Sequence, residues 1–230
     1  MNIRIFEVGG SIRNELMGKS ANDRDFAVIA PNYDTMRKYL LDQGAIFYQE
    51  RPQYVSIRAK LSPLGSVDFT LARKESFYTD ARHPDKITTA QTIEEDLSRR
   101  DFRMNAIARE VGTSVLIDPF NGQLDIVNKC IQCVGNAIDR FKEDRLRIFR
   151  SIRFACQLNF TISSEVSNAI DVFKNITDFE SVTKEMLQIE LCKAFSSDWK
   201  HAVSILQSHP FLWDVIEHKS IWLKPTLEIR

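Results

Sequence analysis

A strand-like segment runs directly into a pair of glycines and then into a helix-like segment, and this junction limits the fold more than any other feature. The apolar stretch at residues 3–8 leads into Gly9-Gly10-Ser11, after which SIRNELMG has helical spacing. Glycine allows a sharp turn that exposes amide groups at the start of a helix. Such a turn can hold the phosphates of a nucleotide, and Arg13, one turn into the helix, could reach the same phosphates.

The first third of the chain continues to alternate between strand and helix. RDFAVIA is strand-like, YDTMRKYLLDQG is an amphipathic helix ended by Gly44, and YVSIRAK and SVDFTLA are strand-like. Residues 74–95 are polar, contain Pro84 and lack sustained periodicity, so we expect a mobile loop with few contacts. These patterns predict a small mixed sheet with helices on one face.

From about residue 134 the pattern becomes helical. Recurring apolar residues predict four helices, at 143–158, 163–174, 183–195 and 198–207. We therefore expect an α+β chain of two domains, with an α/β domain over residues 1–135 and a helical domain over 136–230.

Charge and cysteine content restrict the partners of this chain. The 31 basic residues balance the 31 acidic ones, so any contact with nucleic acid must be local, as at the clusters Arg99-Arg100 and Arg145–Arg153. The sequence has no secretory leader and no apolar run long enough for a membrane span, so we expect a cytoplasmic protein without membrane contact. Cys130 and Cys133 form a lone C-x-x-C in a strand-like segment, which argues against zinc.

Two acids at the start of an apolar strand are the first candidate for chemistry. Asp23 and Asp25 are two residues apart, so both side chains should face the same side of the strand. Two carboxylates on one face repel each other, and bound Mg²⁺ ions would offset that repulsion and bridge phosphates. The alternative is a glycine turn followed by a solvated acid pair beside Arg24.

A third acid, Asp68, shares a face of its own strand with Thr70. It is our candidate for the carboxylate that activates an attacking hydroxyl. An edge-strand Asp that makes a turn or a salt bridge would have the same sequence pattern.

Residues 96–108, DLSRRDFRMNAIA, form a helix-like run rich in arginine. Asp96 and Asp101 alone cannot pair Arg99, Arg100 and Arg103 if all three are buried. The surplus guanidinium suits phosphate or ribose binding, and a solvated helix face is the alternative.

In the helix predicted at 143–158, Asp144 and Arg147 lie one turn apart, opposite an apolar stripe. Together they offer acceptors and planar donors that could bond the edge of a nucleobase. An intrahelical salt bridge between the two would have the same spacing.

Taken in chain order, these segments resemble the class II branch of the tRNA nucleotidyltransferase and bacterial poly(A) polymerase family, within the polymerase-beta-like nucleotidyltransferases. The resemblance covers about residues 3–160, with a weaker tail to about 195. VGGSIRNELMG resembles the phosphate-binding turn, DRDF the metal-binding pair and RRDFRMNA the ribose and triphosphate motif. DPFNGQLDI resembles a hinge-side turn, and EDRLRIFRSIRFA resembles the base-reading helix.

The resemblance implies a small mixed nucleotidyltransferase sheet with helices as a head, followed by an all-helical neck and a reduced body. It implies that Asp23 and Asp25 bind two Mg²⁺ ions, and that Asp144 and Arg147 read CTP and ATP without a template. The residues expected to hold the incoming nucleotide are Gly9, Gly10, Ser11, Arg13, Arg99, Arg100, Asn105, Asp144, Arg147, Arg150 and Arg153. The 3′-hydroxyl of an RNA would attack the α-phosphate and release pyrophosphate.

Three departures from the family pattern matter. Asn14 stands where an Asp is usual, which would remove a partner of Arg13, and Met186 replaces an Arg of the neck. The chain is also a short member of the family, so we expect a different grip on tRNA. Trp199, Trp213 and Trp222 near the end are expected to be core residues, with a surface for a second subunit as the alternative.

The sequence favours CCA addition to the 3′ end of tRNA. Poly(A) addition, partial addition of CC or A alone, and a non-catalytic RNA- or nucleotide-binding module remain as alternatives. The last of these gives no physical reason to keep two mutually repelling acids at one point.

Overall fold

The computed structural model describes residues 3–20, 24–76, 78–82 and 84–221. The chain divides into two compact units, of which the first contains residues 1–77 and 84–135 and the second contains residues 78–83 and 136–230. The first unit is a mixed sheet with helices and the second is helical, which confirms the predicted α+β class.

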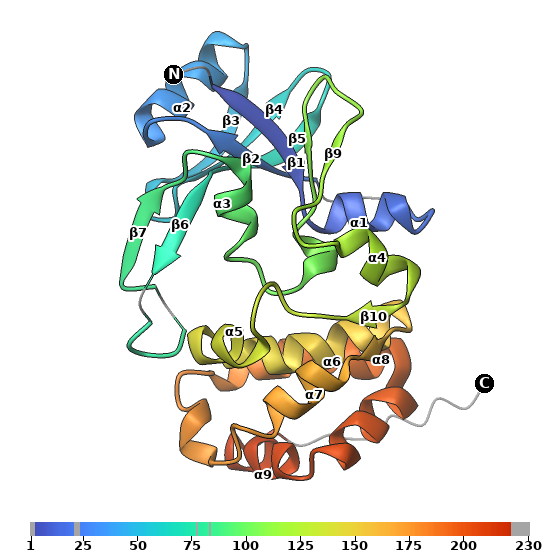
Figure 1. Ribbon diagram of the computed structural model, residues 1–230. Coiled ribbons are helices and arrows are strands. Elements are labelled where there is room, and N and C mark those ends of the chain that lie inside the picture. Colours follow the sequence, from blue (N-terminus) through green and yellow to red (C-terminus); the bar gives the residue numbers. More distant parts are fainter. Residues whose placement is uncertain (1–2, 21–23, 77, 83, 222–230) are drawn as a thin grey trace, which may run out of the picture. The chain divides into compact units, whose positions relative to one another are not determined.

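A seven-stranded sheet organises the first unit, with the strand order β3-β4-β5-β2-β1-β8-β9 (Figure 1). Its strands are β1 (Arg4–Val8), β2 (Asp25–Ile29), β3 (Ile46–Arg51), β4 (Ser56–Leu61), β5 (Gly65–Leu71), β8 (Ala108–Glu110) and β9 (Leu116–Ile117). The strands predicted in the first third are confirmed, and β3 is an additional one. Strand β2 pairs antiparallel with β1 and parallel with β5, so the sheet is mixed as expected.

The core on one side of this sheet is built with helix α2 (Tyr33–Asp42). Asn32 begins the helix, because its side chain accepts a hydrogen bond from the amide of Thr35. Met36 and Leu40 are fully buried in one apolar cluster with Phe26 and Phe69. Helix α1 (Gly10–Leu16) follows β1 directly, and the short helix η1 (Pro52–Tyr54) joins β3 to β4.

The polar segment at 74–95 has more regular structure than we predicted. Strands β6 (Arg73–Ser76) and β7 (Lys86–Thr89) form an antiparallel pair, and α3 (Ile93–Leu97) follows. The expectation of a loop with few contacts is therefore wrong for these elements. Their side chains are mostly polar, so the backbone pairing leaves no apolar alternation in the sequence to detect.

The run at 96–108 is not one helix, contrary to the prediction. Helix α3 ends at Leu97, and the short helix η2 (Arg103–Asn105) and strand β8 follow. Arg103 donates through its backbone amide to the carbonyl of Gln132 at 3.0 Å, and through Nε to the carbonyl of Cys133 at 3.0 Å. These long-range backbone contacts compete with helix formation.

Helix α4 (Gly122–Val127) packs tightly against η2. A Cβ at Gly122 would lie 2.1 Å from the carbonyl oxygen of Arg103, so only glycine fits there. The carboxylate of Asp118 accepts from the amides of Gly122 at 2.7 Å and Gln123 at 2.9 Å, which satisfies the first turn of the helix. Asp125 is buried on the same helix.

The second unit contains helices separated by short connections. They are α5 (Ala137–Glu143), α6 (Leu146–Leu158), α7 (Ser164–Ile170), η3 (Ile176–Phe179), α8 (Lys184–Ser208) and α9 (Phe211–His218). Strand β11 (Thr161–Ile162) also belongs to the second unit, and strand β10 (Cys130–Ile131) belongs to the first. The four predicted helical segments are confirmed in substance, with one interruption near the start of the first.

Asp144 interrupts the helix predicted over 143–158 with an extended backbone at φ −151°. In α8, Asp198 has a non-helical backbone and accepts from the amide of His201 at 3.0 Å. Asp198 thus caps a second helical segment, which agrees with the separate helices predicted at 183–195 and 198–207.

A buried histidine joins the end of α8 to α7. His209 is 3% exposed, and its ring contacts the hydroxyl of Ser167 at 3.2 Å and the carboxylate of Asp171 at 2.9 Å. Both partners come from one turn of α7 and its end. The contact satisfies a buried imidazole and ties the end of α8 to α7.

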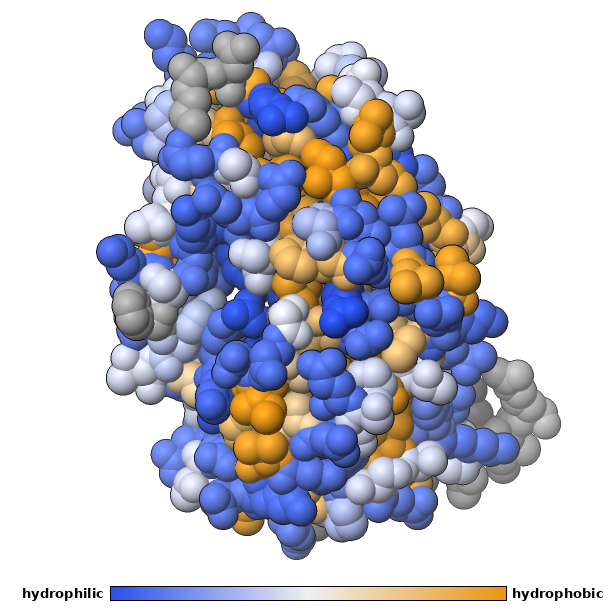
Figure 2. Space-filling view, viewed as in Figure 1, coloured by the Kyte–Doolittle hydropathy of each residue, from blue (hydrophilic) through white to orange (hydrophobic). Residues whose placement is uncertain are grey.

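The surface mixes polar and apolar residues. Figure 2 shows hydrophobic groups interspersed among hydrophilic ones on the face in view. Within the ranges that the structure describes, no helix combines the length and apolar character that a bilayer crossing requires.

Candidate functional site

Two candidate acids lie side by side on neighbouring parallel strands. Asp25 is the first residue of β2, and its partner on β5 is Asp68. Paired residues of adjacent strands project to the same face, so the two carboxylates share one side of the sheet. Asp23 lies outside the described residues, so its predicted place beside Asp25 stays a prediction.

Arg24 is directed to the opposite side by a partner that sequence reasoning missed. Its Nε and Nη2 donate to the two carboxylate oxygens of Glu7 at 2.9 and 2.7 Å. Glu7 is 6% exposed, and the hydrogen bonds from Arg24 lower the pKa of its carboxyl. A carboxylate between Phe6 and Val8 in an apolar strand was the available signal for such a pair.

The glycine turn follows β1 at the level of the acids. Val8 is the partner of Asp25 on β2, and Gly9 comes next with φ at +80°. A Cβ at Gly9 would lie 3.0 Å from Nη1 of Arg100, so the missing side chain makes room for that guanidinium. The hydroxyl of Ser11 is buried and donates to the carbonyl of Val8 at 3.5 Å.

Arg13 is held by two amide side chains. Its Nη1 donates to Oδ1 of Asn105 at 2.7 Å, while Nε and Nη2 donate to Oδ1 of Asn14 at 3.2 and 2.9 Å. The expectation that Asn14 would deprive Arg13 of a partner is therefore wrong, because the amide oxygen takes the place of a carboxylate. The bond from Arg13 to Asn105 ties α1 to η2, and Asn105 also donates to Asp101 at 3.2 Å.

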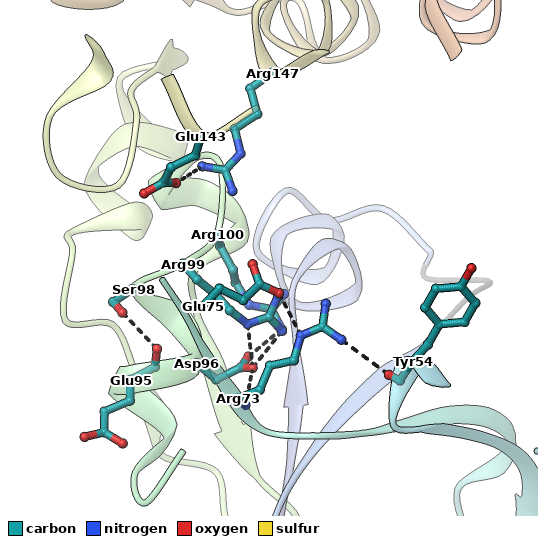
Figure 3. A network of polar contacts seen from close by, with 10 residues as sticks. All are labelled: Tyr54, Arg73, Glu75, Glu95, Asp96, Ser98, Arg99, Arg100, Glu143 and Arg147. Carbon is teal, nitrogen blue, oxygen red and sulfur yellow. Dashed lines mark hydrogen bonds and ion pairs between the residues drawn. The ribbon is translucent and has the colours of Figure 1, made fainter. Parts of the chain in front are cut away.

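The arginines after α3 converge on one buried carboxylate, as Figure 3 shows. Asp96 is 1% exposed and accepts from Nη2 of Arg99 at 2.7 Å and from Nη2 of Arg100 at 3.1 Å. Burial alone would raise the pKa of Asp96, but the two guanidiniums outweigh it and hold the pKa below its usual value. Arg99 also donates to Glu75 at 3.2 Å, so β6 shares the network.

The arginines of the run at 96–108 are paired by more groups than the acids of that run. Two guanidiniums share Asp96, a third (Arg103) binds a backbone carbonyl, and a carboxylate from another strand contributes. Arg100 joins the network to the glycine turn, because it donates to Asp96 and abuts Gly9. A fixed guanidinium at a glycine turn suits an anionic ligand.

In the second unit, Asp144 and Arg147 have different partners from those of a simple intrahelical pair. Asp144 forms an ion pair with Arg82, and its Oδ1 accepts from the amide of Leu146 at 2.9 Å. Arg147 donates to Glu143 at 2.7 Å, and its side chain is 10% exposed. Asp144 therefore lies between the end of α5 and the start of α6, while Arg147 lies in the first turn of α6.

Two further arginines of α6 lie against one aromatic ring. Arg153 is 3.9 Å from the centre of the Phe154 ring and Arg150 is 5.6 Å from it. Arg153 also forms an ion pair with the buried Glu190 of α8. This pair ties α6 to α8, and the predicted nucleotide contacts of both arginines stay predictions.

Comparison with known proteins identifies a family model and relatives that match this chain. A model of the poly A polymerase head domain matches residues 5–132. A CCA-adding enzyme of Listeria monocytogenes serotype 4b (strain CLIP80459) is 35% identical over 212 residues, covering 86% of this chain and 49% of the relative. A CCA-adding enzyme of Levilactobacillus brevis (strain ATCC 367) is 38% identical over 187 residues, covering 81% of this chain and 45% of the relative.

Solved structures are similar over most of the chain. The Bacillus stearothermophilus CCA-adding enzyme in complex with CTP has a TM-score of 0.72 at 28% identity, covering 89% of this chain and 48% of that chain. A tRNA nucleotidyltransferase complexed with a primer tRNA and an incoming ATP analog has a TM-score of 0.73 at 27% identity, covering 94% of this chain and 60% of that chain. The chain spans about half the length of the curated relatives it matches.

Proposed function

Because this chain belongs to the poly(A) polymerase head domain family, which includes class II CCA-adding enzymes, we propose that it adds CCA, from CTP and ATP, to the 3′ end of tRNA. The reaction needs no nucleic-acid template. The observation that carries the proposal is the pairing of Asp25 with Asp68 beside a glycine turn that Arg100 abuts.

The geometry suits nucleotidyl transfer for an electrostatic reason. Two carboxylates on one face of a sheet are unfavourable for folding, whereas a guanidinium against the glycine turn favours a bound phosphate group. The paired acids thus suit a bound cation, and the guanidinium beside the glycine turn suits a bound anion. Asp68 is our candidate for the group that takes the proton of the attacking 3′-hydroxyl, and Arg100 for one that orients the triphosphate.

The acids fit a magnesium site. Asp25 is exposed and Asp68 is half-buried, and carboxylate oxygens are the ligands that Mg²⁺ prefers. Asp23 and Asp25 would hold the ions, which supply charge neutralisation at the phosphates when bound. The relatives with CTP and an ATP analog support the choice of nucleotides.

Base selection is assigned to Asp144 and Arg147. Asp144 presents carboxylate acceptors and Arg147 presents planar donors, the two kinds of group that the edge of cytosine or adenine can bond. In the structure both are paired, Asp144 with Arg82 and Arg147 with Glu143. Reading a base would therefore require at least part of this pairing to be exchanged.

Incubation with tRNA lacking its CCA end and with CTP, ATP or both tests the proposal. We expect CC from CTP alone and complete CCA from the mixture. Asp23→Ala with Asp25→Ala should abolish incorporation and leave the fold intact, because Asp25 is exposed. Asp34→Ala with Asp42→Ala, two exposed acids of α2, is the matched control and should keep full activity.

Each contrary outcome has a distinct meaning. A long oligo(A) product from ATP alone would replace CCA addition by poly(A) addition, and addition of only CC or only A would identify a partial activity. Full activity of the Asp23 and Asp25 variant would refute the assignment of the metal ligands. A wild-type chain that binds nucleotide and RNA without incorporation would be a binding module.

A further inference from the structure

One face of strands β3, β4 and β5 is open and differs in character from the buried face. Along β4 the burial alternates, with Ile57 and Ala59 fully buried and Arg58 and Lys60 exposed. The buried side belongs to the apolar cluster with α2. The other side carries the polar residues, including Asp68 on β5.

Three cations project from this open face. Arg58 is the cross-strand partner of both Gln49 and Asp68, and Arg51 is the partner of Ser56. Residues two apart in a strand project to the same side, which places Lys60 and Arg58 together. Arg51 donates to Gln49 at 2.7 Å, so its side chain lies on this side as well.

The acid of the edge strand is directed away from these cations. Glu50 is the partner of the buried Ile57, and it accepts from Arg37 of α2 at 2.6 Å. Along strands β3 to β5, Asp68 is therefore the acid on the open face. The cations leave that face positive except at the residue assigned to catalysis.

The cations also lead to the paired acids. Arg58 donates to Asp68 at 3.3 Å, and the two side chains are 50% and 41% exposed. Asp68 in turn is the partner of Asp25 on β2. Lys60 and Arg58 are two residues apart on β4, or about 7 Å, and Arg51 lies diagonally across from Arg58 on β3, opposite Ser56. Successive phosphates of a nucleic-acid strand have a similar separation.

An aromatic side chain lies at the end of this row. Tyr54 is 62% exposed and follows Arg51 after a short connection. Figure 3 shows its ring directed away from the network of Arg73, Glu75 and Asp96, while its carbonyl accepts from Arg73. Exposed aromatic rings beside cations are typical of surfaces on which single-stranded bases stack.

We propose that the face formed by Arg51, Arg58 and Lys60 binds the sugar–phosphate backbone of the RNA strand whose 3′ end is extended. The inference rests on the proposed function and specifies how its RNA substrate reaches Asp68. Arg58 pairs with Asp68 before RNA arrives and with a phosphate afterwards, which leaves the carboxylate to the 3′-hydroxyl. The 31 basic and 31 acidic residues of the whole chain balance, so attraction of RNA requires a local row of cations such as this one.

The test removes two cations without changing the acids or Arg58. Arg51→Gln with Lys60→Gln is compared with Arg37→Gln with Lys38→Gln on α2, which packs on the other side of the same strands. Both variants lose the same charge. Binding of a short 5′-labelled single-stranded RNA is measured against salt concentration, and the KM values for RNA and for CTP are measured by incorporation.

The open-face variant should lower the slope of log K against log salt by about 1.4, as expected for two lost phosphate contacts on a single strand. Its KM for RNA should rise at least about tenfold with the KM for CTP unchanged. An equal loss in both variants, or an unchanged slope, would overturn the proposal. If the wild-type protein binds RNA through these cations but adds no nucleotide, the proposed function is refuted, whereas the assignment of the RNA-binding face stands.

Discussion

Replacing Asp125 by Asn should change how the stability of this protein depends on pH. Asp125 lies on α4 and is 2% exposed. Its Oδ1 accepts a 3.4 Å bond from Gln132, while Oδ2 has no hydrogen-bond partner among the described residues. Burial raises the pKa of this carboxyl from 3.8 to about 6, against an opposing effect of Arg103.

The size of the effect follows from this shift. One pKa unit corresponds to about 1.4 kcal/mol, so a rise from 3.8 to about 6 corresponds to ~3 kcal/mol. The folded state keeps the proton up to about pH 6, whereas the unfolded state loses it near pH 3.8. The contribution of the Asp125 carboxyl to the free energy of unfolding is therefore highest below pH 3.8, falls as the pH rises toward 6, and stays lower above pH 6.

Urea denaturation of wild type and Asp125→Asn, at several pH values from about 4 to about 8, measures the effect. The difference in unfolding free energy should shift in favour of the Asn variant by roughly 2.5 kcal/mol across that range. Any fixed cost of the new amide cancels in this comparison. Because the tryptophans are at 199, 213 and 222, in the second unit, circular dichroism is the better probe of the first.

Asp42→Asn, at an exposed carboxyl of the same unit, is the matched control and should show little of this pH dependence. A difference between wild type and Asp125→Asn that stays constant with pH would refute the reasoning. It would mean that the carboxyl finds a partner that the structure does not assign to it.

Two more substitutions test the site. Gly9→Ala should raise the KM for CTP about tenfold, because a Cβ at Gly9 would lie 3.0 Å from Nη1 of Arg100. Gly18→Ala, at φ +69° with nothing within 4 Å of the added Cβ, should cost only backbone strain of roughly 1 kcal/mol. Equal KM values for CTP in both variants would contradict a role of the glycine turn in nucleotide binding. Glu7→Gln should lower the unfolding free energy by about 2 kcal/mol, since it breaks a bidentate, mostly buried ion pair. Glu110→Gln, in an exposed pair, should cost less than about 1 kcal/mol in the same denaturation assay, and similar losses would refute the distinction.

Local patterns in the sequence were enough to predict much of the first sheet. Strands β1, β2, β4 and β5 have apolar stretches or clear alternation, and α2 has an amphipathic pattern and an ending glycine. The hairpin of β6 and β7 could not be predicted in this way, since its exposed side chains give no apolar alternation.

Contacts between distant residues limited the prediction of the site. The pairing of Asp25 with Asp68 depends on strand order, and the bond between Arg24 and Glu7 joins the residue before β2 to a residue of β1. Sequence patterns identify Asp25 and Asp68 separately, but they carry no information that places the two side by side. The ion pair of Asp144 with Arg82 could not be predicted either, because the two residues are 62 positions apart in the sequence.

Arg24, just before β2, and Asp25, its first residue, project to opposite sides of the sheet, and this makes the register of the strand critical. Arg24 binds Glu7 on one side of the sheet, while Asp25 stands beside Asp68 on the other. A slip of one residue in pairing would exchange the two sides and put a guanidinium where the carboxylate belongs. A protein of this kind should therefore tolerate changes in length ahead of the strand far better than mispairing within it, and accurate strand alignment during folding becomes a condition for activity.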